Sequence, residues 1–234
     1  MAAVAVSDLT AQLGGRTVLH DVSGRFDNGV VVLAGPNGAG KSTLLRILAT
    51  LLPFGGKAEV AGCDLSTRLG RRHARQRLGF LPQEAAFPDE FTVMEAVGYS
   101  AWLHRVPANE RPARVVAAIE AVDLGARSTE ALRALSTGLR RRAFLAQAIV
   151  HQPPVLLLDE PTAGVDVEPR SEFRRLVRRL AAGRLVVLST QSDRGDRVPR
   201  RQGRGAGRGA RAIRQGSDRS CRGGDGIRRR RSPG

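Results

Sequence analysis

The 234-residue chain has 41% hydrophobic and 26% charged residues, a balance that permits a sizeable core and excludes global disorder. Its net charge is +16, of which +10 falls in residues 192–234, so a mildly basic body precedes a very basic end. No apolar run approaches the roughly 18 residues that span a bilayer, and the first ten residues lack the basic start of a signal peptide. The two cysteines lie 158 positions apart, which favours a reducing cytosol over a disulfide framework.

Four short apolar runs, bounded by glycine, proline or aspartate, predict buried strands of a parallel sheet. They are residues 30–33, 80–81, 155–158 and 185–188. Helices are predicted between them at residues 42–52, 92–104, 111–122, 138–151 and 168–182. Thr92, with Glu95 three residues later, predicts a capping box at the start of the second helix. Because strands and helices alternate, we expect an α/β fold with a layered sheet.

Three further patterns refine this organisation. Asp27-Asn28-Gly29 is a strong turn signal between two early strands and predicts an antiparallel β piece at the front. Residues from about 86 to 134 contain helices without strands, so we expect core segments 1–85 and 152–191 around a helical subdomain at about 86–151. Basic residues at 71–73, 75 and 140–142 are expected on solvated helix faces, and Trp102 in packing or in a partner contact.

A glycine-rich segment carries the clearest chemistry. Gly35-Pro36-Asn37-Gly38-Ala39-Gly40-Lys41-Ser42 fits the pattern GxxxxGK[ST], and Thr43 follows it. The segment lies between a predicted strand and a predicted helix, which is the context of a P-loop. Its glycines let backbone N–H groups cradle the β- and γ-phosphates at a helix N-terminus. Lys41 would contact the same phosphates and the Ser42 hydroxyl would bind Mg²⁺, so we predict a nucleotide site.

Two carboxylates, Asp159 and Glu160, follow the apolar run at residues 155–158. Acidic residues at the carboxyl end of a parallel strand face the ligand crevice of an α/β sheet. Asp159 is suited to holding the Mg²⁺ shell, and Glu160 could polarise an attacking water as a general base. A solvated strand end or a helix cap would explain the pair without chemistry, but the P-loop in the same chain favours the functional interpretation.

Five motifs together resemble the ATP-binding subunit of ABC transporters over about residues 1–191. They occupy residues 35–43, 81–84 (LPQE), 135–139 (LSTGL), 158–162 (LDEPT) and 163–166 (AGVD). Phe91-Thr92-Val93 and the arginines at 140–142 look most like bacterial ABC-2-type exporters. The resemblance implies a P-loop NTPase (RecA-like) core with an antiparallel β piece and an inserted helical subdomain. It also implies ATP and Mg²⁺ as cofactors, and ATP hydrolysis that powers export through a separate membrane permease at the cytoplasmic face of the membrane.

The resemblance further implies a head-to-tail homodimer, or a heterodimer with a related ATPase, with two ATP molecules at the interface. Gln83 resembles the glutamine that senses Mg²⁺ and couples to the permease, although alone it reads as a surface residue after a strand. Ser136 and Gly138 resemble the signature residues that reach the γ-phosphate bound by the partner subunit. Asp166 resembles an aspartate of the dimer contact.

Three positions depart from the family pattern. Thr137 replaces a signature glycine, and because a β-branched residue adopts φ > 0 only at a cost, we expect a shifted or weakened signature loop. Leu13 stands where an aromatic residue usually stacks on adenine, so apolar contact remains without stacking. Gln191 replaces a histidine that contacts the γ-phosphate. A glutamine amide donates a hydrogen bond but carries no proton, so we expect slower hydrolysis with binding retained.

The basic end, residues 192–234, contains 14 Arg and 10 Gly without helical or strand periodicity, and we expect it to be disordered. It could bind nucleic acid or anionic lipid by charge. A reading-frame error explains it better, because it takes the place of strands and a helix that the resemblance requires. Two other functions stay open, a non-transport ABC ATPase acting on nucleic acid or ribosomes and an impaired ATP-binding product. We do not expect nucleic acid as a partner.

Overall fold

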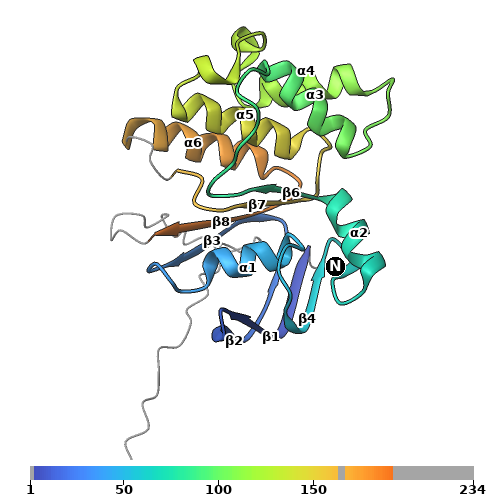
Figure 1. Ribbon diagram of the computed structural model, residues 1–234, viewed down its shortest axis with the longest axis vertical. Coiled ribbons are helices and arrows are strands. Elements are labelled where there is room, and N and C mark those ends of the chain that lie inside the picture. Colours follow the sequence, from blue (N-terminus) through green and yellow to red (C-terminus); the bar gives the residue numbers. More distant parts are fainter. Residues whose placement is uncertain (1–2, 163–166, 192–234) are drawn as a thin grey trace, which may run out of the picture.

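The computed structural model describes residues 3–162 and 167–191, which form two β-sheets and the helices packed on them (Figure 1). The chain thus has the expected α/β fold. In Figure 1 the helices α3 to α6 cover one face of a parallel sheet, and α1 lies between its other face and an antiparallel sheet. The predicted disordered end and Asp166 lie outside the described residues. Within the described residues, no helix is long and apolar enough to cross a membrane.

The parallel sheet has the strand order β3-β8-β7-β6. Its strands are β3 (Gly29–Gly35), β6 (Leu78–Leu81), β7 (Val155–Leu158) and β8 (Leu185–Gln191), which contain the four predicted apolar runs. The register pairs Gly35 with Gln191 and Leu81 with Leu158. The carboxyl ends of all four strands therefore meet at one edge, where the segments that follow them come together.

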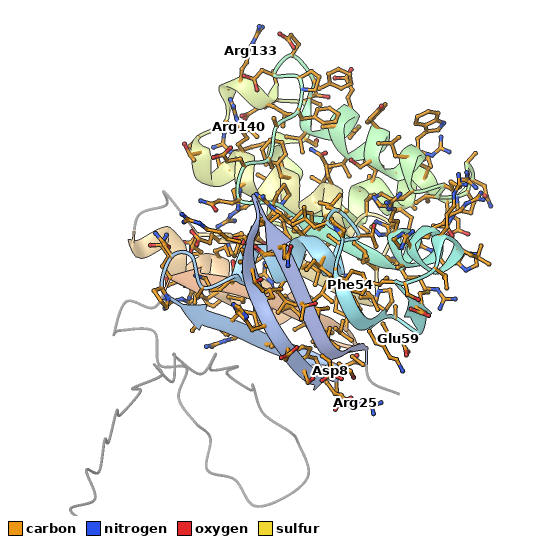
Figure 2. All side chains as sticks on the ribbon, turned by 60° about the horizontal axis from the view of Figure 1, so that its bottom comes forward. Asp8, Arg25, Phe54, Glu59, Arg133 and Arg140 are labelled. Carbon is orange, nitrogen blue, oxygen red and sulfur yellow. The ribbon has the colours of Figure 1, made fainter. Side chains whose placement is uncertain are left out.

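The antiparallel sheet has the order β2-β1-β4-β5. Its strands are β1 (Val4–Leu13), β2 (Arg16–Phe26), β4 (Gly55–Val60) and β5 (Cys63–Asp64). The predicted turn at residues 27–29 does separate two strands, β2 and β3, but these belong to different sheets. The hairpin that builds this sheet turns instead at Gly14 and Gly15, both with positive φ. Figure 2 shows Arg25 and Glu59 on this sheet, far from Arg133 and Arg140 in the helical layer.

All five predicted helices are present, with ends that differ from the prediction by at most four residues. They are α1 (Lys41–Leu48), α3 (Val93–Leu103), α4 (Arg111–Ala121), α5 (Thr137–Ile149) and α6 (Val167–Leu180). The capping box of α3 is confirmed: Glu95 N–H donates to Thr92 Oγ1 at 3.2 Å and Thr92 N–H donates to Glu95 Oε2 at 2.8 Å. The basic residues at 71–73 and 75 lie on a further helix, α2 (Arg68–Arg77), where Ala74 is the buried residue.

Two hydrophobic clusters lie on opposite faces of the parallel sheet. In β7, Leu156 and Leu158 join the cluster under α3 to α6, and Val155 and Leu157 join the cluster with α1 and the antiparallel sheet. All four side chains are fully buried. A strand covered on both faces needs apolar residues at every position, which is why the predicted runs show no alternation. The rigid sheet fixes the positions of the loops at its carboxyl edge.

The arginines at 140–142 do not form the solvated face that we predicted. Arg140 pairs with Asp89 at 3.2 Å, and Arg142 pairs with Glu172 at 2.7 Å. Arg141 turns toward the carboxyl edge of the parallel sheet, where it donates to backbone carbonyls. The expectation was wrong because the α5 surface that carries them packs against neighbouring segments instead of facing water.

Candidate nucleotide site

The predicted P-loop connects β3 to α1 at the carboxyl edge of the parallel sheet. Gly38 and Gly40 both have φ of 79°, in the left-handed region that favours glycine. A Cβ atom at Gly40 would lie 2.5 Å from Leu19 Cδ2, so this position also lacks room for a side chain. Helix α1 has no side-chain cap and no acidic residue in its first turn. Its first N–H groups are therefore available to an anion such as phosphate.

A cavity of about 310 Å³ opens at this loop. The loop itself contributes residues 37–43 to the cavity. Three other segments each contribute one residue: Gln83 after β6, Glu160 after β7 and Gln191 at the end of β8. Its wall consists of Asn37, Gly38, Ala39, Gly40, Lys41, Ser42, Thr43, Gln83, Glu160 and Gln191. The volume is of the order that small-molecule pockets have. Residues 154 positions apart in the sequence thus share one concave surface.

Lys41 folds back over its own loop. Its Nζ atom donates hydrogen bonds to the carbonyl oxygens of Gly35, at 2.8 Å, and Pro36, at 3.0 Å. Gly35 and Pro36 do not line the cavity themselves, but their carbonyl oxygens hold the side chain of Lys41, a residue that does line it. The positive charge is therefore kept at the cavity wall beside the N-terminus of α1, where both attract phosphate.

Asp159 is fully buried below the cavity. Its Oδ1 atom accepts hydrogen bonds from Ser42 Oγ at 2.9 Å and from Ser189 Oγ at 2.8 Å, whereas its buried Oδ2 atom has no partner among the described residues. A carboxylate oxygen left without a donor, next to a serine hydroxyl, fits a hard cation such as Mg²⁺. Gln83 lines the cavity beside them. The described residues contain no cluster of three or more His, Cys, Asp or Glu side chains that could hold a metal.

Glu160 has the most constrained backbone of the site. Its φ is 44°, in the left-handed region that non-glycine residues rarely adopt. Its N–H donates to Ser189 Oγ at 2.7 Å, and its Oε2 atom accepts from Gln191 Nε2 at 3.2 Å. Sequence reasoning missed Ser189, although a small polar residue directly after the apolar run of β8 is a signal that could have found it. Ser189 links the two acidic residues through one hydroxyl.

The signature segment does not show the backbone strain that we expected at Thr137. Helix α5 begins at Thr137, and neither Thr137 nor Gly138 has a positive φ. A helical first residue needs no left-handed backbone, so the β-branched side chain costs little there. Ser136 is the N-cap residue, with its Oγ accepting from Leu139 N–H at 3.4 Å. The strain that we expected at Thr137 is therefore absent, and a shifted or weakened signature loop stays a prediction.

Three predicted binding residues lie away from the cavity. Leu13 ends β1 with a side chain that is 39% exposed. Ser136 is exposed and Gly138 half-buried at the start of α5, and none of the three lines the cavity. In one copy of the chain, the cavity is formed by the loop, Gln83, Glu160 and Gln191.

A glycine-rich loop between a parallel strand and a helix, with an acidic strand end beside it, defines a P-loop nucleotide-binding protein. Residues 19–163 match the family model described as ABC transporter, and the chain belongs to this family.

Curated relatives agree with this assignment. The chain is 37% identical over 190 residues to the daunorubicin resistance ATP-binding protein DrrA3 of Streptomyces coeruleorubidus, covering 80% of this chain and 60% of that protein. It is 40% identical over 163 residues to the probable multidrug ABC transporter ATP-binding protein YbhF of Escherichia coli, covering 69% of this chain and 28% of that protein. The solved structure of cbiO1 from Clostridium perfringens superposes with a TM-score of 0.74 at 26% identity, covering 82% of this chain and 79% of that one.

Proposed function

We propose that this chain binds and hydrolyses ATP as the nucleotide-binding subunit of an ABC transporter, and that hydrolysis powers export through a separate membrane permease. The observation that carries the proposal is the cavity in which Lys41, Glu160 and Gln191 meet around the N-terminus of α1. The daunorubicin resistance and multidrug names of two relatives support export.

The geometry supports a role for each part of the site. The N–H groups of the loop and the Lys41 ammonium group bind the phosphates. The oxygens of Ser42, Gln83 and Asp159 would hold Mg²⁺, which would offset the negative charge of the phosphates. Glu160 accepts the proton of the attacking water at a carboxylate oxygen. Gln191 donates to the Oε2 atom of Glu160 and so orients the carboxylate. Leu13 would contribute apolar contact to the base.

An exposed aromatic surface on the helical layer supports a permease partner. Tyr99 is 43% and Trp102 57% exposed, with their ring centroids 5.7 Å apart, and Tyr99 also contacts Phe87 at 5.7 Å. Phe87 lies four residues after Gln83, so one short segment contributes both to this surface and to the cavity. Exposed apolar patches of this kind mark interaction sites. We place the partner there, with residues 86–151 as a helical subdomain on a core of residues 1–85 and 152–191, at the cytoplasmic face of the membrane.

The proposed assembly is a head-to-tail dimer, with a second copy or a related ATPase. Ser136 and Gly138 lie at the start of α5 outside the cavity of their own chain. This position is compatible with contact to ATP on the partner subunit, at the N-terminus of a 13-residue helix.

The chain offers a matched pair of variants, because Lys41 and Lys57 are its two lysines. Lys57 is exposed on β4. We expect Lys41→Ala to lower ATP affinity and phosphate release by at least about 10-fold, whereas Lys57→Ala leaves both near the wild-type values. Absence of phosphate release from the wild-type chain with ATP and Mg²⁺, alone and with its permease, would refute the proposal.

A further inference from the structure

Arg141 joins two of the segments that form the cavity. It lies in the second turn of α5, four residues after the helix begins. Its Nη1 atom donates to the carbonyl oxygen of Gln83 at 2.7 Å. Its Nη2 atom donates to the carbonyl oxygens of Asp159, at 3.0 Å, and Glu160, at 3.2 Å. One side chain thus connects the segment after β6 to the segment after β7.

The chemistry of the guanidinium group explains why arginine occupies this position. Its planar fork presents several N–H donors in fixed directions, so it can bond two separate chain segments at once. Burial lowers the pKa of Arg141, and the Asp159 carboxylate acts in the opposite direction. Its buried Nε atom has no partner among the described residues. A buried N–H left unpaired is costly, so the fork is aligned on the three carbonyls at the expense of its remaining donor.

The neighbouring arginine shows a different arrangement. Arg142 pairs with the carboxylates of Glu172 and Asp123, whose side chains are 56% and 51% exposed. Those ion pairs tie α5 to the outer surface of the molecule. The hydrogen bonds of Arg141, in contrast, all go to backbone atoms beside the cavity.

Glu160 is thereby held from three directions. Ser189 accepts its N–H, Arg141 donates to its C=O and Gln191 donates to its carboxylate. With φ at 44°, the residue needs such surrounding contacts to keep this backbone conformation. The carbonyl of Gln83 is fixed by the same guanidinium group, and so the start of the Gln83 side chain is fixed as well.

We propose that Arg141 is a positioning residue: it holds Gln83 and Glu160 in fixed positions relative to the signature helix α5 and is required for turnover. The inference rests on the proposed ATP hydrolysis. It predicts that loss of the guanidinium group frees both cavity segments together while the phosphate-binding loop stays in place.

The experiment compares Arg141→Ala and Arg141→Lys with Arg142→Ala as the matched control on the same helix. For Arg141→Ala we expect kcat to fall about 10- to 100-fold, because small displacements of catalytic groups have effects of this size. The dissociation constant for ATP should stay within about threefold of the wild-type value. Amide hydrogen exchange should accelerate in peptides covering residues 82–85 and 159–161. Arg141→Lys should recover part of kcat, and Arg142→Ala should leave kcat and both peptides near the wild type.

Two results would overturn the inference: wild-type kcat in Arg141→Ala, or equal exchange in Arg141→Ala and Arg142→Ala. Hydrogen exchange does not depend on hydrolysis. The wild type could release no phosphate while exchange in both peptides accelerates in Arg141→Ala and not in Arg142→Ala. In that case the proposed hydrolysis would fail and the structural link between α5 and the two segments would stand.

Discussion

Two adjacent carboxylates at the end of β7 have different surroundings. Asp159 is fully buried and accepts two hydroxyl hydrogen bonds, whereas Glu160 reaches the cavity wall and accepts from Gln191. One side chain can therefore serve a cation while its neighbour serves a water molecule. The two roles that the sequence predicts for this pair therefore fall on carboxylates with different surroundings.

Substitution of Gln191 tests how Glu160 is assisted. The glutamine amide orients the Glu160 carboxylate but cannot carry a proton. We expect Gln191→His to raise kcat by about 2- to 10-fold with little change in ATP affinity, measured as steady-state phosphate release and nucleotide binding. Thr190→Ser, one position earlier in β8, is the control. Unchanged or lower kcat in Gln191→His would show that the glutamine is no handicap.

At the scale of elements, two histidines join α3, α5 and β6. His104, the C-cap residue of α3, stacks on His151 with ring centroids 3.7 Å apart and planes 2° apart. His151 Nε2 lies 3.1 Å from the carbonyl oxygen of Leu78, so this nitrogen carries the proton and donates. The buried Nδ1 atom has no partner in the described part of the chain. Protonation would place a second N–H there without an acceptor.

This packing makes stability depend on pH. Burial, followed by the neighbouring His104, lowers the pKa of His151 from 6.5 to about 4. The folded state binds this proton less readily than the unfolded state does. The contribution of neutral His151 to the free energy of unfolding is therefore complete above about pH 6.5 and is lost as the pH falls toward 4. We expect up to about 3 kcal/mol of unfolding free energy to disappear over this range. Denaturant unfolding at pH 7.5 and pH 4.5 measures it.

His151→Gln should flatten this dependence between pH 4 and 6.5, whereas His73→Gln on the exposed face of α2 should preserve the wild-type slope. Equal slopes in the wild type and His151→Gln would refute the role of the stacked pair.

The elements were predictable where local signals are strong. Apolar runs gave the strands of the parallel sheet, and Thr92 with Glu95 marked the start of α3. The glycine pattern predicted the phosphate-binding loop at residues 35–42, because few backbone conformations are associated with this pattern. Partners distant in sequence were not predictable: nothing local indicates that the segment at 27–29 joins two sheets, or that Arg141 turns inward while Arg142 pairs outward. These choices depend on packing that brings together residues far apart in the chain.

At the scale of the whole molecule, one short stretch of chain contributes Gln83 to the cavity and Phe87 to the exposed aromatic surface. Trp102→Ala should reduce co-purification with the permease at least about fivefold, because aromatic residues commonly dominate interface energies. Phosphate release by the isolated chain should stay near the wild-type rate. Val116→Ala, at a residue 50% exposed on α4, is the control. Undiminished co-purification of Trp102→Ala would move the docking surface elsewhere.

The most direct test of the central claim, ATP hydrolysis assisted by Glu160, is phosphate release by Glu160→Gln. The substitution keeps size and hydrogen bonding but removes the base. We predict that kcat falls at least about 100-fold while the dissociation constant for ATP stays within about threefold, and that Glu59→Gln on the exposed side of β4 behaves as the wild type. Wild-type phosphate release by Glu160→Gln would contradict the account.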